Sequence, residues 1–373
     1  RTRRLEAMPA ALTLDDISVV LIWTAIVLYA LAFIAYAIDL GRRSAAAVDA
    51  KPVANAGARE LVGAGGVSVA FGDAVAPTAV APPGVNATVS RGRGRDNGAS
   101  GAGEASTAKQ RFVMARIGTA LTVIGFLLHL AGTITRGIAG ERVPWSNMYE
   151  FAMMGTLLIV AVYLAVLTRY DLRFLGAFIT GLVVVLLGGS AVTFFVEVIP
   201  LAEPLRSVWL VIHVFVASLS TAFFALAFGL SVVQLMQARR ERLAALPAEE
   251  AKPTARGLGF LRTLPGADAL ESLAYRFAVI GFAFWTFTLI AGSIWAQDAW
   301  GRYWGFDTKE VWTFVIWVIY AGYIHARATR GWRGTRSAWL SIIGFSAVIF
   351  NFTIVNMFFK GLHSYSGLTS GGS

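Results

Sequence analysis

The chain contains no cysteine, and only 14% of its 373 residues are charged. The absence of cysteine excludes a disulfide framework, a thiolate metal site and any thiol redox role for this chain. Any thiol that takes part in its chemistry must therefore come from another protein. The low charge, the 56% hydrophobic residues and the positive mean hydropathy are typical of a multi-spanning membrane protein.

The sequence also lacks a glycine-rich phosphate-binding loop, which disfavours an ATP-driven pump. Its formal net charge is +10, but the basic residues lie in segments between apolar runs. Such an excess is typical of the cytoplasmic flanks of membrane helices, so we expect no nucleic-acid partner. No cleavable signal peptide is expected, because the first apolar run already has full spanning length.

Long apolar runs dominate the chain. A helix that crosses about 30 Å of hydrocarbon needs about 20 mainly apolar residues. The runs that meet this requirement predict an all-α integral membrane protein with about eight transmembrane helices. The predicted spans are Ile17–Ile38, Val113–Thr135, Phe151–Leu167, Phe174–Val196, Trp209–Met236, Phe277–Ala296, Val311–His325 and Ala338–Met357.

Between the first two spans, Asp39 to Arg111 is rich in alanine, glycine and valine and shows no helical or strand periodicity. This composition predicts a disordered linker. Its Arg-Gly run, Arg91 to Arg95, could contact RNA or anionic lipid, although a solvated tether is the simpler interpretation. The expected domains are an N-terminal transmembrane helix (1–41), a disordered cytoplasmic linker (42–111) and a transmembrane domain (112–373).

The distribution of lysine and arginine predicts the orientation of the spans. One side collects the basic residues of the linker, of the segment from Arg239 to Arg276 and of the loop from Arg327 to Arg336. Cytoplasmic loops carry such an excess, so this side is predicted to be cytoplasmic. Both termini are then expected on the outside.

A tryptophan-rich stretch, Trp295–Trp312, separates the sixth and seventh predicted spans and is expected to face outward. It is too polar to span a bilayer and too aromatic for an ordinary solvated loop. Tryptophan and tyrosine gather at membrane interfaces in any case, so an interfacial belt is one interpretation. A binding surface held at the membrane boundary is the other.

The predicted topology places two of the four histidines at the outer boundary. His213 lies just inside the outer end of the fifth span, and His363 lies just beyond the last span. Two neutral imidazoles there could ligate one iron from opposite faces of a porphyrin, with aromatic residues as a flat apolar wall. The cations that could pair with the propionates are Arg142, Arg302, Lys309 and Lys360.

The other two histidines lie away from this boundary. His325 ends the seventh span, about 20 Å from Trp312 at 1.5 Å per residue, so it cannot share the outer site. An ionisable group at that depth indicates function, although a histidine that reaches the cytoplasmic interface is an open alternative. For His129, in the second span, a hydrogen bond to a neighbouring helix is the favoured interpretation.

Five ordered blocks resemble the CcsA/ResC family of c-type cytochrome assembly, whose tryptophan-rich signature is called WWD. The similarity extends over roughly Ala115 to Gly367. The blocks are Pro144–Glu150, Pro204–Val214, Trp300–Glu310, Tyr323–Arg327, and Asn356 with Gly361–Tyr365.

The resemblance implies a heme-delivery and cytochrome c synthase subunit of the System II pathway in the bacterial plasma membrane. Its cofactor would be heme, and its partners a ResB/CcsB-type membrane subunit, apocytochrome c and the thiol-disulfide reductases of the pathway. By matching, His213 and His363 would be the axial ligands at the outer site. His325 would match the membrane ligand that receives heme first, with the opposite ligand supplied by the partner chain.

The heme-binding surface that the resemblance implies is built mainly from the tryptophan-rich stretch. Besides the three histidines, the candidate heme-binding residues are Tyr149, Trp295, Trp300, Arg302, Trp304, Phe306, Asp307 and Trp312. The chain departs from the family at two positions, with Phe306 where a second tryptophan is common and Thr308 where proline is common. Phenylalanine keeps a π-face but loses the indole N–H, and the loss of proline relaxes the backbone only modestly.

The reaction implied is addition of the two thiols of an apocytochrome Cys-x-x-Cys-His motif across the heme vinyl groups. Orientation by the chain can replace a large entropy cost, so no dedicated nucleophile is required. Asp307, Lys309 and Glu310 are candidates to assist proton transfer, although Asp and Lys beside a helix start are equally plausible as helix caps and interface charges. A heme exporter or chaperone without catalysis is the second functional hypothesis, and an unrelated secondary transporter with broken helices is the third.

Overall fold

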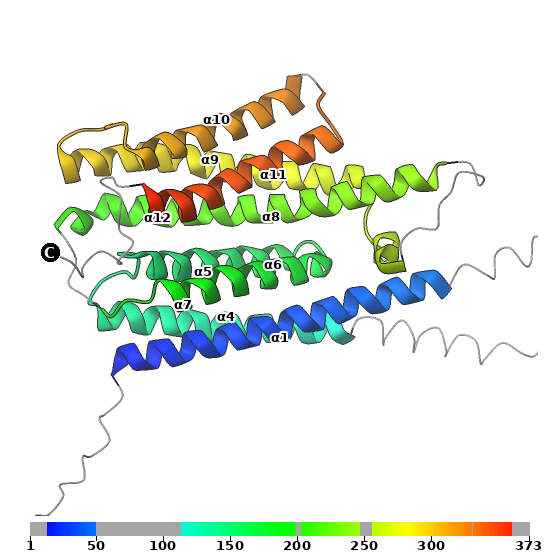
Figure 1. Ribbon diagram of the computed structural model, residues 1–373, viewed down its shortest axis with the longest axis horizontal. Helices are drawn as coiled ribbons and strands as arrows, with labels where there is room; N and C mark the ends of the chain where they lie inside the picture. The colour runs from blue at the N-terminus through cyan, green and yellow to red at the C-terminus, as the bar shows by residue number, and fades with distance from the viewer. Residues whose placement is uncertain (1–12, 50–112, 199–202, 247–255, 330, 360–373) are drawn as a thin grey trace, which may run out of the picture.

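The described part of the chain forms a bundle of helices whose axes run roughly along one direction, joined by loops (Figure 1). This computed structural model describes residues 13–49, 113–198, 203–246, 256–329 and 331–359. The α-helices are α1 (Leu14–Asp49), α4 (Val113–Ala139), α5 (Met148–Leu167), α6 (Gly176–Val183), α7 (Gly189–Thr193), α8 (Val208–Ala244), α9 (Ala267–Trp300), α10 (Thr308–Thr329), α11 (Thr335–Phe350) and α12 (Asn356–Phe358). Short 3₁₀ segments lie at Arg173–Leu175, Glu203–Arg206 and Arg256–Thr263.

Two of the helices contain a π-helical turn. Val184–Gly188 joins α6 to α7, and Asn351–Val355 joins α11 to α12. Each composite helix therefore makes a single crossing. The sequence indicated an interruption only at Gly188-Gly189, because neither glycine nor proline marks the second turn. Single π-helical turns are rare in α-helices and occur frequently at functional sites.

Seven helices of the described chain are long and apolar enough to cross a membrane. The eighth predicted span corresponds to α10, which is 22 residues long and packs against α9 and α11. Lys309, Glu310 and Arg327 lower its hydropathy. The prediction of an all-α integral membrane protein is confirmed.

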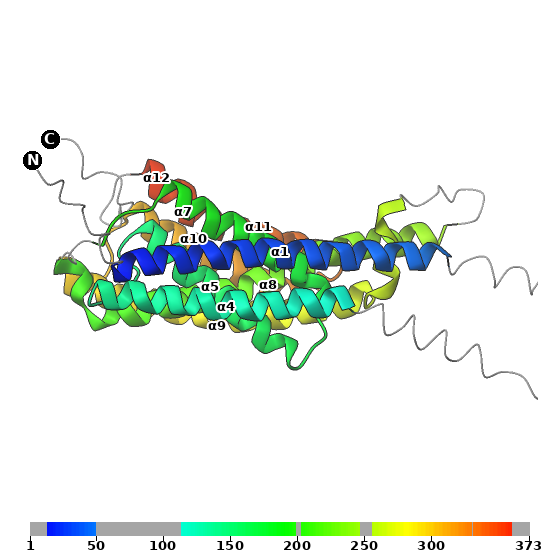
Figure 2. The same cartoon turned by 90° about the horizontal axis from the view of Figure 1, so that it is seen from below.

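The helices form two groups, one of α1, α4, α5 and α6–α7 and the other of α8, α9, α10 and α11–α12 (Figure 1). The main contact between the groups is that of α5 with α8. The first described helix begins, and the last ends, at the end of the bundle that carries the α9–α10 loop (Figures 1 and 2). We call this end of the bundle the loop end.

Helix α1 packs along α4 through glycines at seven-residue intervals. Each glycine faces a large side chain of α1, and a Cβ there would come within about 3 Å of it. The pairs are Gly118 with Tyr36, Gly125 with Tyr29, and Gly132 with Ile22. Small residues allow membrane helices to approach closely, so the N-terminal helix belongs to the same bundle.

Helix α1 is longer than the sequence predicted. It continues to Asp49, so residues 42–49 are helical where a disordered linker was expected. Arg43 pairs with Asp39 one turn earlier at 2.6 Å, and alanines with high helix propensity follow. The remainder of the predicted linker lies outside the described residues.

Candidate functional site

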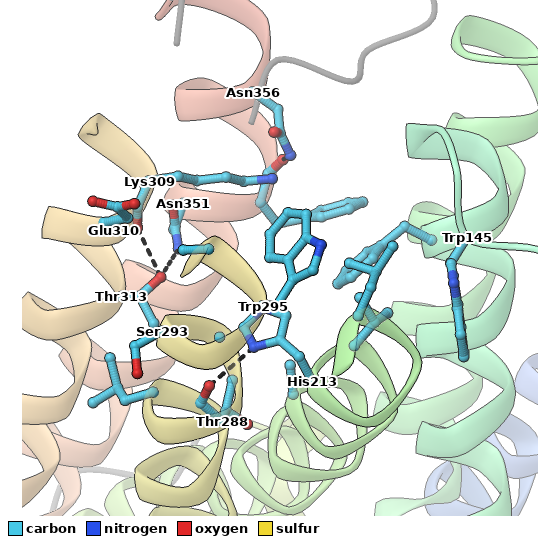
Figure 3. A pocket seen from close by; sticks show the side chains of 18 of the residues that line it. Trp145, His213, Thr288, Ser293, Trp295, Lys309, Glu310, Thr313, Asn351 and Asn356 are labelled. Atoms are coloured by element: carbon cyan, nitrogen blue, oxygen red, sulfur yellow. Dashed lines mark hydrogen bonds between the residues drawn. The ribbon is translucent and has the colours of Figure 1, made fainter. Parts of the chain in front are cut away.

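A cavity opens at the loop end, between α5, α8, α9, α10 and the π-helical turn that follows α11 (Figure 3). It contains about 170 Å³ of space for the centres of water molecules. Its lining is mainly apolar and aromatic, with a few polar side chains. This combination is typical of small-molecule and cofactor sites. The residues used below are Trp145, His213, Trp285, Trp295, Tyr303, Trp304, Lys309, Glu310, Asn351 and Asn356.

His213 lies in the second turn of α8 and reaches this cavity, as its predicted role requires. Its Nδ1 lies 2.9 Å from the backbone oxygen of Thr288 in α9 (Figure 3). A carbonyl oxygen can only accept a hydrogen bond, so Nδ1 must carry the proton and Nε2 the lone pair. The imidazole also stacks on Trp295, with ring centroids 5.9 Å apart and planes at 23°.

Trp295 and Trp300 both lie within α9, although Trp300 was predicted to lie beyond the end of the sixth span. The helix continues to Trp300 and ends at Gly301, which adopts a left-handed conformation with φ of 71°. Glycine at this position is a common end of helices, whereas hydropathy alone ended the predicted span too early. Trp295 is buried and contacts Trp300 at 4.8 Å between ring centroids.

The α9–α10 loop is therefore short, running from Gly301 to Asp307. Tyr303 and Trp304 of this loop line the cavity. Phe306 is 80% exposed and has a φ of 57°, which is rare for a bulky residue. The exposed Arg302 lies against Gly305, and neither Arg302 nor Phe306 is among the lining residues.

Trp312 and Tyr149 also lie outside the cavity lining. Trp312 packs on Phe350 of α11 with ring centroids 4.5 Å apart, so it joins α10 to the core. Tyr149 is buried and meets Phe195 edge-on at 5.4 Å. Both contribute to helix packing next to the cavity.

Asp307 and Glu310 form the start of α10. The Asp307 carboxylate accepts a hydrogen bond from the backbone N–H of Thr308 at 2.9 Å. Glu310 accepts from the N–H groups of Gly305 at 2.8 Å and Asp307 at 3.2 Å. The bond from the Asp307 N–H to Glu310, three residues later, is one half of a capping box, and the carboxylate contact with Thr308 agrees with the capping alternative for Asp307.

Lys309, which lies between Asp307 and Glu310 in the sequence, lines the cavity (Figure 3). Among the described residues, no carboxylate lies within ion-pair distance of its ammonium group. Asn351, on the π-helical turn, also lines the cavity, and its side-chain oxygen has no hydrogen-bond partner in the described part of the chain. Charged groups away from water are costly unless they are paired, so the Lys309 ammonium suits an anionic group, whereas the Asn351 oxygen can only accept a hydrogen bond from a donor.

A smaller, mainly apolar chamber adjoins the cavity farther from the loop end. Lys309, Trp285 and Asn351 line both spaces. The chamber is bounded by α5, α8, α11 and the π-helical turn that contains Leu186. No pattern in the sequence indicates this chamber.

The remaining histidines have different environments. His325 is exposed on the face of α10 that also exposes Val318 and Gly322, and it is absent from the cavity. His129 is fully buried, with its Nδ1 3.4 Å from the Tyr29 hydroxyl of α1, which agrees with the structural interpretation. His363 and the candidate cation Lys360 lie outside the described residues.

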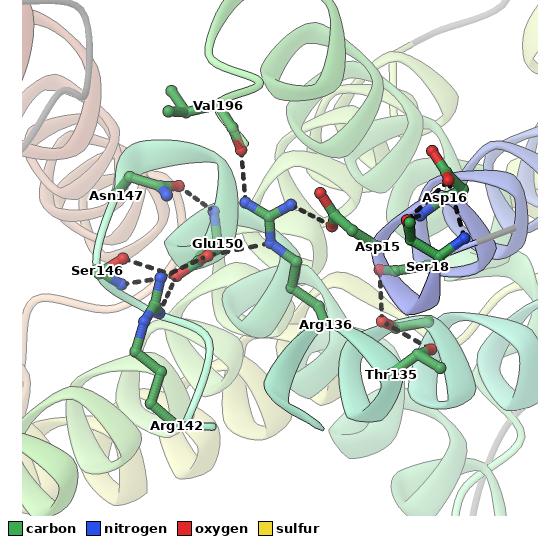
Figure 4. A network of polar contacts seen from close by, with 12 residues as sticks. Asp15, Asp16, Ser18, Thr135, Arg136, Arg142, Ser146, Asn147, Glu150 and Val196 are labelled. Carbon is green, nitrogen blue, oxygen red and sulfur yellow. Dashed lines mark hydrogen bonds and ion pairs between the residues drawn. The ribbon is translucent and has the colours of Figure 1, made fainter. Parts of the chain in front are cut away.

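Arg142 was predicted as a possible partner of the propionates. It belongs instead to a buried ion-pair network (Figure 4). Glu150 accepts hydrogen bonds from Arg142 at 2.6 and 3.1 Å and from Arg136 at 3.1 Å. Arg136 also pairs with Asp15 of α1 at 2.5 Å. The N–H and hydroxyl of Ser146 each donate to Glu150 at 2.9 Å, which fixes the segment between α4 and α5.

This network positions one wall of the cavity. Trp145 and Asn147 are neighbours of Ser146 and line the cavity, and Asn147 caps α5 by accepting from the N–H of Glu150. The sequence signal for this role is Ser146-Asn147 followed by Glu150, a helix-start pattern. This pattern is part of a block that resembles the family, but it does not indicate that Glu150 pairs with Arg136 or that Arg136 pairs with Asp15.

The fold and cavity define a multi-pass membrane protein with a histidine-containing aromatic site at one end. The family described as "Cytochrome C assembly protein" matches residues 145–363, so the chain belongs to this family. Among similar proteins, "Cytochrome c biogenesis protein CcsA" of Guillardia theta is 33% identical over 251 residues, covering 63% of this chain and 80% of that protein. The protein of the same description from Synechococcus elongatus is 32% identical over 288 residues, covering 67% and 87%.

A third similar protein, "Cytochrome c biogenesis protein CcsA" of Trieres chinensis, is 30% identical over 278 residues and covers 69% of this chain. Membership of the CcsA/ResC family, predicted from the sequence blocks, is confirmed. The chain thus has a role in c-type cytochrome biogenesis. Its helix α1 lies outside the residues that the family description matches.

The ion-pair network yields a stability prediction. Glu150→Gln removes the carboxylate between two buried arginines, so we expect a loss of about 3–5 kcal/mol in the free energy of unfolding. Thermal unfolding in detergent measures this loss. Asp171→Asn is the matched control, because Asp171 pairs with Arg173 at a more exposed position, and it should change stability by less than about 1 kcal/mol. Equal effects of the two substitutions would contradict the role of the network.

Proposed function

We propose that this chain binds heme in the loop-end cavity and presents it for attachment to apocytochrome c. The observation that carries the proposal is the state of His213. Its Nδ1–H donates to the Thr288 carbonyl, which leaves Nε2 as the electron-pair donor. Histidines that bind metals typically use this arrangement, since a hydrogen bond to one nitrogen fixes the orientation of the other.

The donor set of the cavity suits heme better than a bare metal ion. In the described part of the chain, no group of three His, Asp or Glu side chains comes together to hold a metal. A single imidazole among aromatic rings suits an iron whose other in-plane ligands belong to a macrocycle. Trp295 and Trp304 supply flat apolar surface beside His213.

We assign the second axial position to His363. Asn356 lines the cavity, and the last described residue, Phe359, precedes His363 by four residues. Four extended residues span at most about 14 Å, so the chain length is compatible with an imidazole at the same cavity. The aromatic residues Trp300 and Phe306, next to this site, would shield one edge of the bound group.

Lys309 is assigned as the partner of a heme propionate. It lines the cavity without an ion pair among described side chains, whereas Arg142 is held by Glu150. A carboxylate against this ammonium would form a charge-assisted hydrogen bond. Of the three candidates for proton transfer, Lys309 is the one retained, because the carboxylates of Asp307 and Glu310 cap α10.

The role of the chain in attachment is to orient the reactants. When bound, heme supplies two vinyl groups, and the apocytochrome supplies both thiols because this chain has no cysteine. Each S–H adds across one vinyl group, so no atom is lost and no oxidant is required. Holding the reacting groups together in an apolar cavity replaces much of the entropy cost of their encounter.

The remaining assignments concern topology and partners. The loop end and both termini face outward and the linker is cytoplasmic, because lysine and arginine accumulate on the opposite side. His325 lies exposed on α10, where a ResB-type subunit in the bacterial plasma membrane would supply the opposite ligand of an inner heme. Thiol-disulfide reductases keep the apocytochrome thiols reduced.

His213→Ala in the purified complex should abolish the low-spin bis-histidine heme spectrum of the outer site, because one axial ligand is lost. His363→Ala should do the same. Absorption spectra of the reduced proteins measure the effect. His213→Gly with added imidazole is the control, since an external ligand should restore the spectrum. An unaltered spectrum in both alanine variants would refute the outer site.

Lys309→Gln should weaken heme binding about 10-fold, the cost of about one charged hydrogen bond. Heme dimethyl ester, which has no carboxylates, should bind the wild type and this variant equally. Titration of the heme-depleted complex compares the two ligands. Lys309→Arg is the control and should retain most of the preference for heme. Equal weakening for both ligands would exclude a carboxylate partner.

A heme exporter or chaperone without catalysis is the alternative. Incubation of the heme-loaded complex with a Cys-x-x-Cys-His peptide separates the two functions. A synthase forms a thioether-linked heme peptide that survives acid extraction and is detected by mass spectrometry. The Ser-x-x-Ser-His peptide, which lacks thiols, is the control. Release of unmodified heme to the peptide would favour the exporter.

A further inference from the structure

One face of α9 is shaped around the His213 ring. Thr288, Gly292 and Trp295 follow one another at intervals of four and three residues, so they lie on the same side of the helix. Thr288 accepts the hydrogen bond from Nδ1, and Trp295 stacks on the ring. Gly292 lies between them and has no side chain where the ring passes.

A side chain at Gly292 would collide with the imidazole. A Cβ built on it would lie 2.6 Å from Cε1 and 2.7 Å from Nδ1 of His213. Ordinary contacts between such atoms are 3.4 Å or longer, so any other residue would displace the ring. Glycine in a helix interior costs about 1 kcal/mol relative to alanine, and Gly292 lies inside α9, more than two turns before the helix ends at Trp300.

We propose that Gly292 is a positioning residue for the His213 ligand. The missing side chain lets the imidazole approach α9 closely enough to reach the Thr288 carbonyl. That hydrogen bond keeps the proton on Nδ1 and the lone pair on Nε2, and Trp295 holds the ring plane. The proposal rests on the proposed function, in which Nε2 binds the heme iron.

The consequence is specific to ligation. With a methyl group at residue 292, the ring must rotate or withdraw and the Nδ1–H···O bond lengthens or breaks. Loss of such a supporting hydrogen bond typically lowers metal affinity 10- to 100-fold. It would also reduce the electron donation of the imidazole to a bound iron and so shift the midpoint potential of the heme.

Gly292→Ala in the purified complex tests the proposal. We expect heme affinity at the outer site to fall about 10-fold or more, the reduction potential to shift, and added imidazole to restore the low-spin spectrum. Gly189→Ala is the matched control, because a Cβ at this helical glycine meets nothing within 4 Å. It should leave all three measurements unchanged. A wild-type spectrum and potential in Gly292→Ala would overturn the proposal.

A second background keeps the test decisive if Gly292→Ala also reduces folding. In His213→Gly the ring is absent, so adding Gly292→Ala should not lower the melting temperature of this variant. Heme binding in the presence of external imidazole should also stay unchanged. If Gly292→Ala lowers the melting temperature and heme binding equally in the wild-type and His213→Gly backgrounds, the proposal is overturned, because the effect would then arise elsewhere in α9. If His213→Ala itself leaves heme binding intact, the proposed function fails first, independently of Gly292.

Discussion

The contact of α8 with α9 is the constraint on which the cavity depends. These helices meet at glycines, where Gly292 receives His213 and Gly281 receives Phe224. A hydrogen bond from Ser220 to the Gly281 carbonyl and one from His213 to the Thr288 carbonyl lie along the same seam. Close approach and a backbone acceptor together give the imidazole a single orientation at the edge of the cavity.

A second set of interactions keeps the other side of the cavity in place. Arg136 and Glu150 are almost completely buried, and each has several partners from different segments. Buried charges are tolerated when every one is paired, so the network fixes the segment before α5 relative to α1 and α4. Asp15 takes part although α1 lies outside the family match, which makes this helix an integral part of the bundle.

Sequence reasoning recovered the helices well and the site in part. The spans followed from apolar run length, but their ends did not, because Gly301 and the Arg43–Asp39 pair end or extend helices independently of hydropathy. Of the candidate site residues, His213, Trp295, Trp304 and Lys309 line the cavity. Trp312 and Tyr149 were assigned to heme, yet their contacts are with Phe350 and Phe195, since an aromatic residue has the same composition signal in either role.

The sequence by itself determined that the chain is a helical membrane protein of the cytochrome assembly family, because apolar runs and ordered blocks are local properties. The tertiary structure decided which polar groups meet. Glu150 and Arg136 are 14 residues apart in the chain, and His213 and Thr288 are 75 apart. Such contacts depend on how helices pack, and helix packing depends on small residues such as Gly292 whose partners no local pattern specifies.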